Sequence, residues 1–92
     1  MEYIFIAREG DKAAVVEYKE RFDKKTSQEL IDDYNKQAKL GIVGVHQQAL
    51  CLIGMAYSFK KRFADSPIYL TDGTVLGMKG IIRLNGEKFE YI

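Results

Sequence analysis

The chain has 92 residues, of which 47% are hydrophobic, and its formal net charge is +1 at pH 7. This length and composition exclude an intrinsically disordered protein and predict a single domain over residues 1–92. Acidic and basic residues are interspersed, which argues against a protein whose main task is to bind nucleic acid. A single cysteine excludes an internal disulfide, and the first residues lack a signal-peptide pattern, so we expect a cytoplasmic protein.

The first predicted element is a strand over residues 2–7. This stretch is rich in aromatic and β-branched side chains and is followed by a glycine-containing turn. Because side chains alternate along a strand, aromatic residues occupy one face and isoleucines the other. Both faces are therefore apolar, and we expect an inner strand rather than an edge strand.

Residues 11–22 fit two structures. As a helix, they begin with Asp11 as N-cap, and apolar side chains recur at helical spacing at Val15, Tyr18 and Phe22. As a strand, the same residues would pair back on residues 2–7 through a tight turn. We prefer the helix.

A second helix is predicted over residues 26–39. It begins with a capping box, in which Thr26 and Glu29 each accept a hydrogen bond from the other's backbone N–H. Its apolar stripe consists of Leu30, Ile31, Tyr34 and Ala38. We expect this helix to lie against the one that follows.

The connection at residues 40–44 contains two glycines. Gly41 suits the left-handed C′ position that ends a helix. We expect Ile42 and Val43 to anchor the connection in the core.

The longest apolar run predicts a buried central helix over about residues 44–64. At 100° per residue, one narrow apolar sector contains Val45, Ala49, Leu52, Ala56, Phe59 and Phe63, with Leu50, Ile53 and Tyr57 along its flank. The apolar run is much shorter than the roughly 20 residues that span a bilayer, so we expect no membrane insertion.

The opposite side of this helix carries a strip of small residues, Cys51, Gly54 and Ser58. A glycine in a helix interior costs on the order of 1 kcal/mol relative to alanine, so the missing side chain has a structural use. We favour close packing against the chain's own preceding helix. The alternative is a self-association face, which would make the protein a homo-oligomer.

Two Asx-Gly pairs predict hairpins in the last third of the chain. Asp72-Gly73 and Asn85-Gly86 each separate short β-branched or aromatic runs, as in type I′ turns. In the second hairpin we expect Ile82 to face Phe89, with Leu84 on the same apolar side. Arg83 would then face Lys88 on the solvent side.

No catalytic or metal-binding motif is present. His46 is the only histidine and has no recognisable partner, so it is a weak candidate for a residue in a cleft. Cys51 points about 140° away from His46 around the helix, which excludes a Cys–His pair within it. We therefore expect a non-enzyme without metal or cofactor.

The predicted fold is α+β, with two or three helices on a small, mainly antiparallel sheet. The predicted function is a non-catalytic binding or oligomerisation module whose partner is another protein or a second copy. The alternative is a small nucleic-acid-binding or regulatory protein. It would use a basic patch formed by Lys36, Lys39, Lys60, Lys61 and Arg62.

Overall fold

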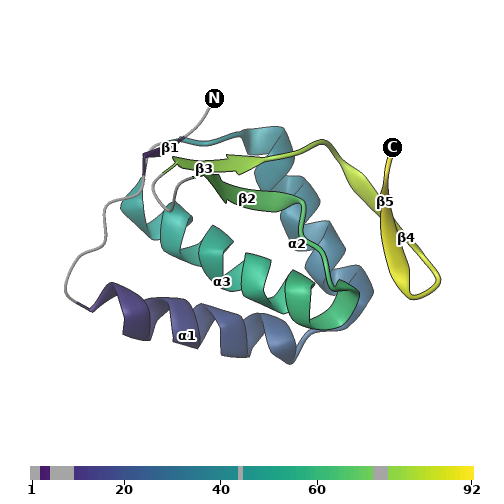
Figure 1. The fold of residues 1–92 in the computed structure, drawn as a ribbon, viewed down its shortest axis with the longest axis horizontal. Helices are drawn as coiled ribbons and strands as arrows, with labels where there is room; N and C mark the ends of the chain where they lie inside the picture. The colour runs from purple at the N-terminus through teal and green to yellow at the C-terminus, as the bar shows by residue number, and fades with distance from the viewer. Residues whose placement is uncertain (1–2, 5–9, 44, 72–74) are drawn as a thin grey trace.

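The computed structural model describes residues 3–4, 10–43, 45–71 and 75–92 (Figure 1). In chain order the elements are β1 (Tyr3–Ile4), α1 (Asp11–Asp23), α2 (Ser27–Leu40), α3 (His46–Phe63), β2 (Ile68–Thr71), β3 (Val75–Met78), β4 (Ile82–Asn85) and β5 (Lys88–Tyr91). The strands form an antiparallel sheet in the order β1-β3-β2 and a separate β4-β5 hairpin. The α+β class and the central helix are thus confirmed.

Residues 11–22 are helical, as preferred, but the helix begins differently from the prediction. Gly10, with φ 87°, is the N-cap, and Asp11 is the first helical residue. The Asp11 carboxylate contacts His46 on α3.

The second helix begins with the predicted capping box. The Glu29 N–H donates to Thr26 Oγ1 at 3.1 Å, and the Thr26 N–H donates to Glu29 Oε1 at 2.9 Å. At its other end Gly41 has φ 81° but ψ 179°, so its backbone is positive in φ without being left-handed helical. Ile42 is buried as expected, whereas Val43 is exposed, and residue 44 lies outside the described part.

Helices α1 and α3 approach each other closely at Gly54. A Cβ on Gly54 would lie 2.6 Å from Tyr18 Cβ and 2.9 Å from the Lys19 backbone nitrogen. Ser58, one turn further, is fully buried. The small-residue strip therefore receives a helix of the same chain, which is α1 rather than α2. The alternative, a self-association face on Cys51, Gly54 and Ser58, is not available at Gly54 and Ser58, because α1 occupies the space beside Gly54 and Ser58 is buried, whereas Cys51 stays half-buried.

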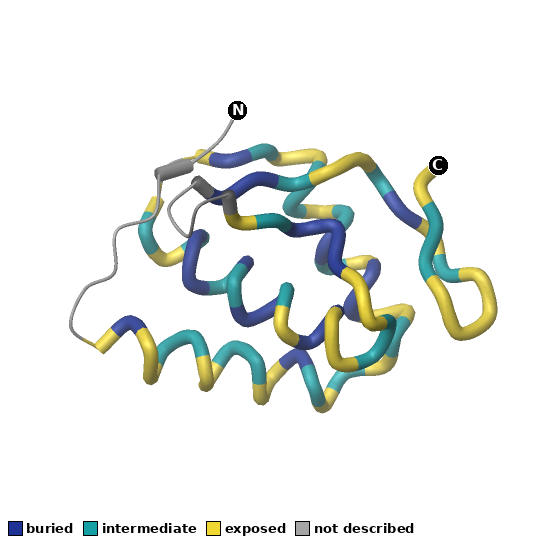
Figure 2. Tube along the Cα trace, viewed as in Figure 1, coloured by how far each residue is buried: buried dark blue, intermediate teal, exposed yellow. Residues whose placement is uncertain are grey.

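The core lies between α3, the inner side of α2 and the sheet (Figure 2). Tyr34 and Phe59 are fully buried and meet edge to face, with ring centroids 5.7 Å apart. Two residues of the predicted apolar sector and its flank are exposed instead. Val45 is 53% exposed because it is the N-cap, with extended backbone, so helical spacing does not describe its direction. Tyr57 is 54% exposed.

The strand positions differ from the sequence-based prediction in two respects. In the three-stranded sheet β3 is central and β1 lies at an edge, so the expected inner position of the N-terminal strand is wrong. In the hairpin, Leu84 pairs with Phe89 and Arg83 pairs with Glu90, a register two residues away from the prediction. The reason is the turn, whose central residues are Gly86 and Glu87 rather than Asn85 and Gly86, with positive φ at Gly86 only. The first hairpin turn, residues 72–74, lies outside the described part.

The Gly54 contact yields a stability prediction. Gly54→Ala should lower the free energy of unfolding by about 1–2 kcal/mol, because overpacking against backbone outweighs alanine's higher helix propensity. Urea denaturation measures this difference. Gly80→Ala is the control, since a Cβ there meets nothing within 4 Å, and its effect should be within about 0.5 kcal/mol. Unchanged or increased stability of Gly54→Ala would contradict the close approach.

Candidate functional site

His46 has a partner that the sequence did not reveal. Its Nε2 lies 3.0 Å from each carboxylate oxygen of Asp11, and both side chains are largely buried. The pair connects the first residue of α3 to the first residue of α1, which are 35 positions apart in sequence. The pair holds the N-terminal end of α1 against α3, so His46 lies at the junction of these two helices.

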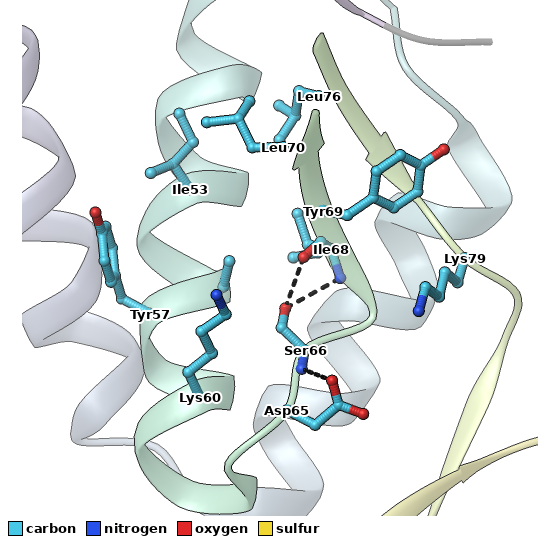
Figure 3. Close-up of a pocket in the computed structure, with 11 residues that line it drawn as sticks. Ile53, Tyr57, Lys60, Asp65, Ser66, Ile68, Tyr69, Leu70, Leu76 and Lys79 are labelled. Carbon is cyan, nitrogen blue, oxygen red and sulfur yellow. Dashed lines mark hydrogen bonds between the residues drawn. The ribbon is translucent and has the colours of Figure 1, made fainter. Parts of the chain in front are cut away.

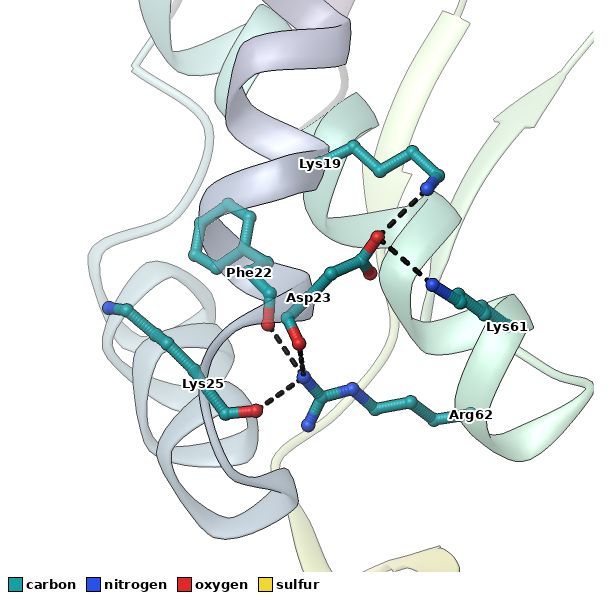
Figure 4. Close-up of polar contacts among 6 residues, drawn as sticks. All are labelled: Lys19, Phe22, Asp23, Lys25, Lys61 and Arg62. Carbon is teal, nitrogen blue, oxygen red and sulfur yellow. Dashed lines mark hydrogen bonds and ion pairs between the residues drawn. The ribbon is translucent and has the colours of Figure 1, made fainter.

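At the opposite end of the same helices, Arg62 closes the C-terminus of α1 (Figure 4). Its Nη2 donates to the carbonyls of Phe22 at 2.7 Å, Asp23 at 3.1 Å and Lys25. The Phe22 carbonyl also accepts the Lys25 N–H at 3.1 Å. The guanidinium thus adds hydrogen bonds to carbonyls at the end of α1, where the regular helical ladder stops. Arg62 is thereby a structural residue and not part of a free basic patch.

Asp23, at the C-terminus of α1, forms ion pairs with two lysines at this junction. Lys19 lies 2.8 Å and Lys61 3.4 Å from its Oδ2 (Figure 4). Burial would raise the pKa of the Asp23 carboxyl, but the hydrogen bond from Lys19, the neighbouring Ser58 hydroxyl and the charges of Lys19 and Lys61 outweigh it. The net result is a pKa below the ordinary value. Ser58 Oγ is close enough to contribute, although its geometry falls short of a full hydrogen bond.

The remaining predicted basic residues lie elsewhere. Arg62 reaches Ser27, the first residue of α2, with Nη1 3.5 Å from Oγ. Lys36 and Lys39 follow Ser27 by nine and twelve positions, or about 13 and 18 Å along the helix. The five cations therefore do not form one patch, contrary to the prediction.

Cys51 is half-buried between α1 and α2, beside Tyr18, Gln37 and Met55. Burial raises the pKa of its thiol, which disfavours the reactive thiolate. Nothing in this environment makes it a nucleophile.

Tyr57 marks the most accessible apolar surface on the central helix. Together with Ile53 it stands between two hollows, one of about 410 Å³ toward β2 and one of about 380 Å³ toward α1. Figure 3 shows the first hollow, where Leu70 and Leu76 point toward Ile53 while the Tyr69 ring points to the other side of β2. On the α1 side Val16 is 46% exposed, and on the β2 side Leu70 is 40% exposed. We call Val16, Ile53, Tyr57 and Leu70 the Tyr57 surface.

The rim of this surface is charged. Each hollow is lined by two lysines and one aspartate: Lys60, Lys79 and Asp65 toward β2, and Lys12, Lys19 and Asp11 toward α1. Asp11 is paired with His46, and the Asp65 carboxylate accepts the Ser66 N–H at 2.8 Å. Lys19 is paired with Asp23, but Lys12, Lys60 and Lys79 still outnumber the two aspartates, so the local charge is positive and favours an acidic or anionic neighbour.

Sequence periodicity alone missed the Tyr57 surface. The spacing placed Tyr57 on the flank of the apolar sector, and only the positions of α1 and β2 determine that this flank stays uncovered.

Among the described residues, no group of three or more His, Cys, Asp and Glu side chains could hold a metal ion. Nor does any helix in that part of the chain have the length and apolar content needed to cross a membrane.

The comparisons with known proteins are negative in all three cases. No protein-family model matches the chain, and no curated protein and no solved structure shows significant similarity to it. Functional inference therefore depends on the geometry of the chain itself.

The Asp23 junction predicts a specific pH dependence. Because the folded pKa of Asp23 is depressed, its ion pairs stabilise the fold fully above the ordinary aspartate pKa of about 3.9. This contribution is lost as pH falls through the lower folded value. The unfolding midpoint in urea should therefore fall more steeply between about pH 5 and pH 2 for the wild type than for Asp23→Asn.

The pKa values of the exposed carboxyls of Glu29 and Glu90 are also lowered, so only the difference between wild type and variant isolates Asp23. Parallel pH profiles for the two proteins would show that the junction contributes nothing.

Proposed function

We propose that the chain is a non-catalytic binding module that takes a segment of a partner protein on the Tyr57 surface. The observation that carries the proposal is the 54% exposure of Tyr57, an aromatic residue of the central helix, between two hollows. Protein interfaces concentrate binding energy in aromatic anchors that lie between pockets and are ringed by polar groups. Tyr57 and its lysine-rich rim have this arrangement.

The charge of the rim narrows the chemistry of the partner. Lys12, Lys60 and Lys79 surround apolar side chains, so the complementary segment presents apolar residues flanked by carboxylates. Apolar contact with Ile53 and Tyr57 would supply affinity, and the lysines would select for acidic flanks and speed the encounter.

The alternative of nucleic-acid binding has less support. It requires a continuous cationic surface, whereas Arg62 and Lys61 are engaged with α1, and Lys36 and Lys39 lie at the other end of α2. The lysines around Tyr57 are separated by apolar side chains and interspersed with Asp65.

A peptide selection tests the proposal. A displayed library of random peptides is selected against the wild-type chain, and the recovered peptides are then measured against Tyr57→Asp. We expect enrichment of apolar sequences with acidic flanks and a loss of affinity of about tenfold or more in the variant, because a buried anchor is replaced by a charge.

The matched control is Val45→Asp. Val45 is the N-cap of α3 and is 53% exposed, but it lies outside the Tyr57 surface, so binding should be retained. Circular dichroism verifies that both variants fold. Recovery of no peptide, or equal binding to Tyr57→Asp and wild type, would refute the proposed function.

A further inference from the structure

The hydrogen-bonding pattern of an antiparallel pair determines which backbone N–H and C=O groups point away from the neighbouring strand. In the hairpin, the Ile92 N–H donates to the Ile81 carbonyl at 3.0 Å, which continues the β4–β5 register. Hydrogen-bonded and non-hydrogen-bonded pairs alternate in an antiparallel ladder. Lys88 and Glu90 therefore bond to β4, while the N–H and C=O groups of Phe89 and Tyr91 point to the outer side of β5.

The same argument applies to β2. The Lys79 N–H donates to the Pro67 carbonyl at 2.8 Å, so the backbone groups of Ile68 point away from β3. Ser66 fills that position with its hydroxyl, which donates to the Ile68 carbonyl and accepts from the Ile68 N–H, each at 3.0 Å (Figure 3).

On β4 the outward groups of Ile82 are occupied in a similar way. The Ile82 N–H donates to Asn35 Oδ1 at 3.0 Å, and Asn35 Nδ2 donates to the Ile82 carbonyl at 2.8 Å. A side-chain amide of α2 thus takes the place of a neighbouring strand. In the described part of the chain, two outer edges are therefore closed in part by a side chain, at Ile68 and at Ile82.

No side chain of the described residues closes the outer edge of β5 in this way. Among the described residues, β4 is the only strand that pairs with β5. Tyr91, on β5, is 44% exposed. Unpaired strand edges readily pair with another strand, because their backbone N–H and C=O groups lack partners. The open edge of β5 therefore presents backbone groups to which a further strand can add.

The charges along β5 indicate which strand could add to its open edge. Lys88 and Glu90 lie on the face opposite to Phe89, and Phe89 packs on Phe59 and Phe63 with ring centroids 5.6 and 5.4 Å away. Glu90 pairs with Arg83 at 2.6 Å, whereas Lys88 makes no ion pair among the described residues. When two copies of β5 run antiparallel about a two-fold axis at Phe89, each Lys88 lies opposite Glu90 of the second copy.

We propose that the outer edge of β5 pairs with β5 of a second copy of the chain, forming a two-fold dimer with the four-stranded sheet β4-β5-β5-β4. In this arrangement the outward N–H and C=O of Phe89 bond to the same residue of the second copy. Both copies contribute the same surface, so the contact closes and does not propagate into fibres. The interface is separate from the Tyr57 surface, and the two proposals succeed or fail independently.

Amide hydrogen exchange and sedimentation together test the dimer in the wild-type chain. Sedimentation from about 10 μM to 1 mM should show a monomer–dimer equilibrium. Over the same range the amides of Phe89 and Tyr91 should become protected, while those of Lys88 and Glu90 are protected at every concentration because they bond to β4. A monomer at 1 mM, or a dimer without new protection at Phe89 and Tyr91, overturns the proposal.

A charge reversal tests the register. Lys88→Glu places like charges opposite each other at two symmetric positions and should raise the dimer dissociation constant by roughly tenfold. Lys39→Glu makes the same charge change on exposed α2 surface and should leave dimerisation unchanged. An equimolar mixture of Lys88→Glu and Glu90→Lys should restore pairing, since opposite charges then face each other. Equal dimerisation of Lys88→Glu and wild type contradicts the proposed register.

Discussion

The distance between α1 and α3 is set by the missing side chain at Gly54. The backbone of α1 passes so close that even a methyl group on Gly54 would overlap Tyr18 and Lys19. The two ends of the contact are then held by different chemistry: the Asp11–His46 pair at one end, and Arg62 and Lys61 on the C-terminus of α1 at the other. Because α1 lies this close, the space beside Gly54 is filled from within the chain.

Local signals in the sequence predicted local structure well. The capping box at Thr26 and Glu29, the helical spacing of Val15, Tyr18 and Phe22, and the apolar run of the central helix depend on neighbours within a few positions. The fold class followed from their order. What the sequence could not determine is which element covers which face, because this depends on contacts such as Gly54 with Tyr18, 36 positions apart.

Contacts between residues distant in sequence also explain why the candidate site differs from the sequence-based prediction. One basic patch would require the helices to bring together Lys36, Lys39, Lys60, Lys61 and Arg62. The antiparallel course of α2 and α3 instead separates Lys36 and Lys39 from Arg62. Helical periodicity places Tyr57 on the flank of the apolar sector, because it gives the direction of a side chain around the helix but not whether another element packs against it. In the second hairpin a two-residue change in register followed from the placement of a single glycine, Gly86, within the turn.

Ser66 illustrates how one small side chain can determine whether the backbone groups of a strand edge are open to a further strand. Its hydroxyl occupies both outward groups of Ile68, immediately beside the hollow lined by Ile53, Tyr57 and Leu70. Replacing Ser66 by alanine would therefore do more than weaken a turn: it would place an open strand edge next to an apolar groove, which is the combination from which unintended β-sheet assembly begins. A single hydroxyl thus keeps this strand edge closed beside the hollow, so a substitution at this one position could change the assembly behaviour of the chain without changing its core.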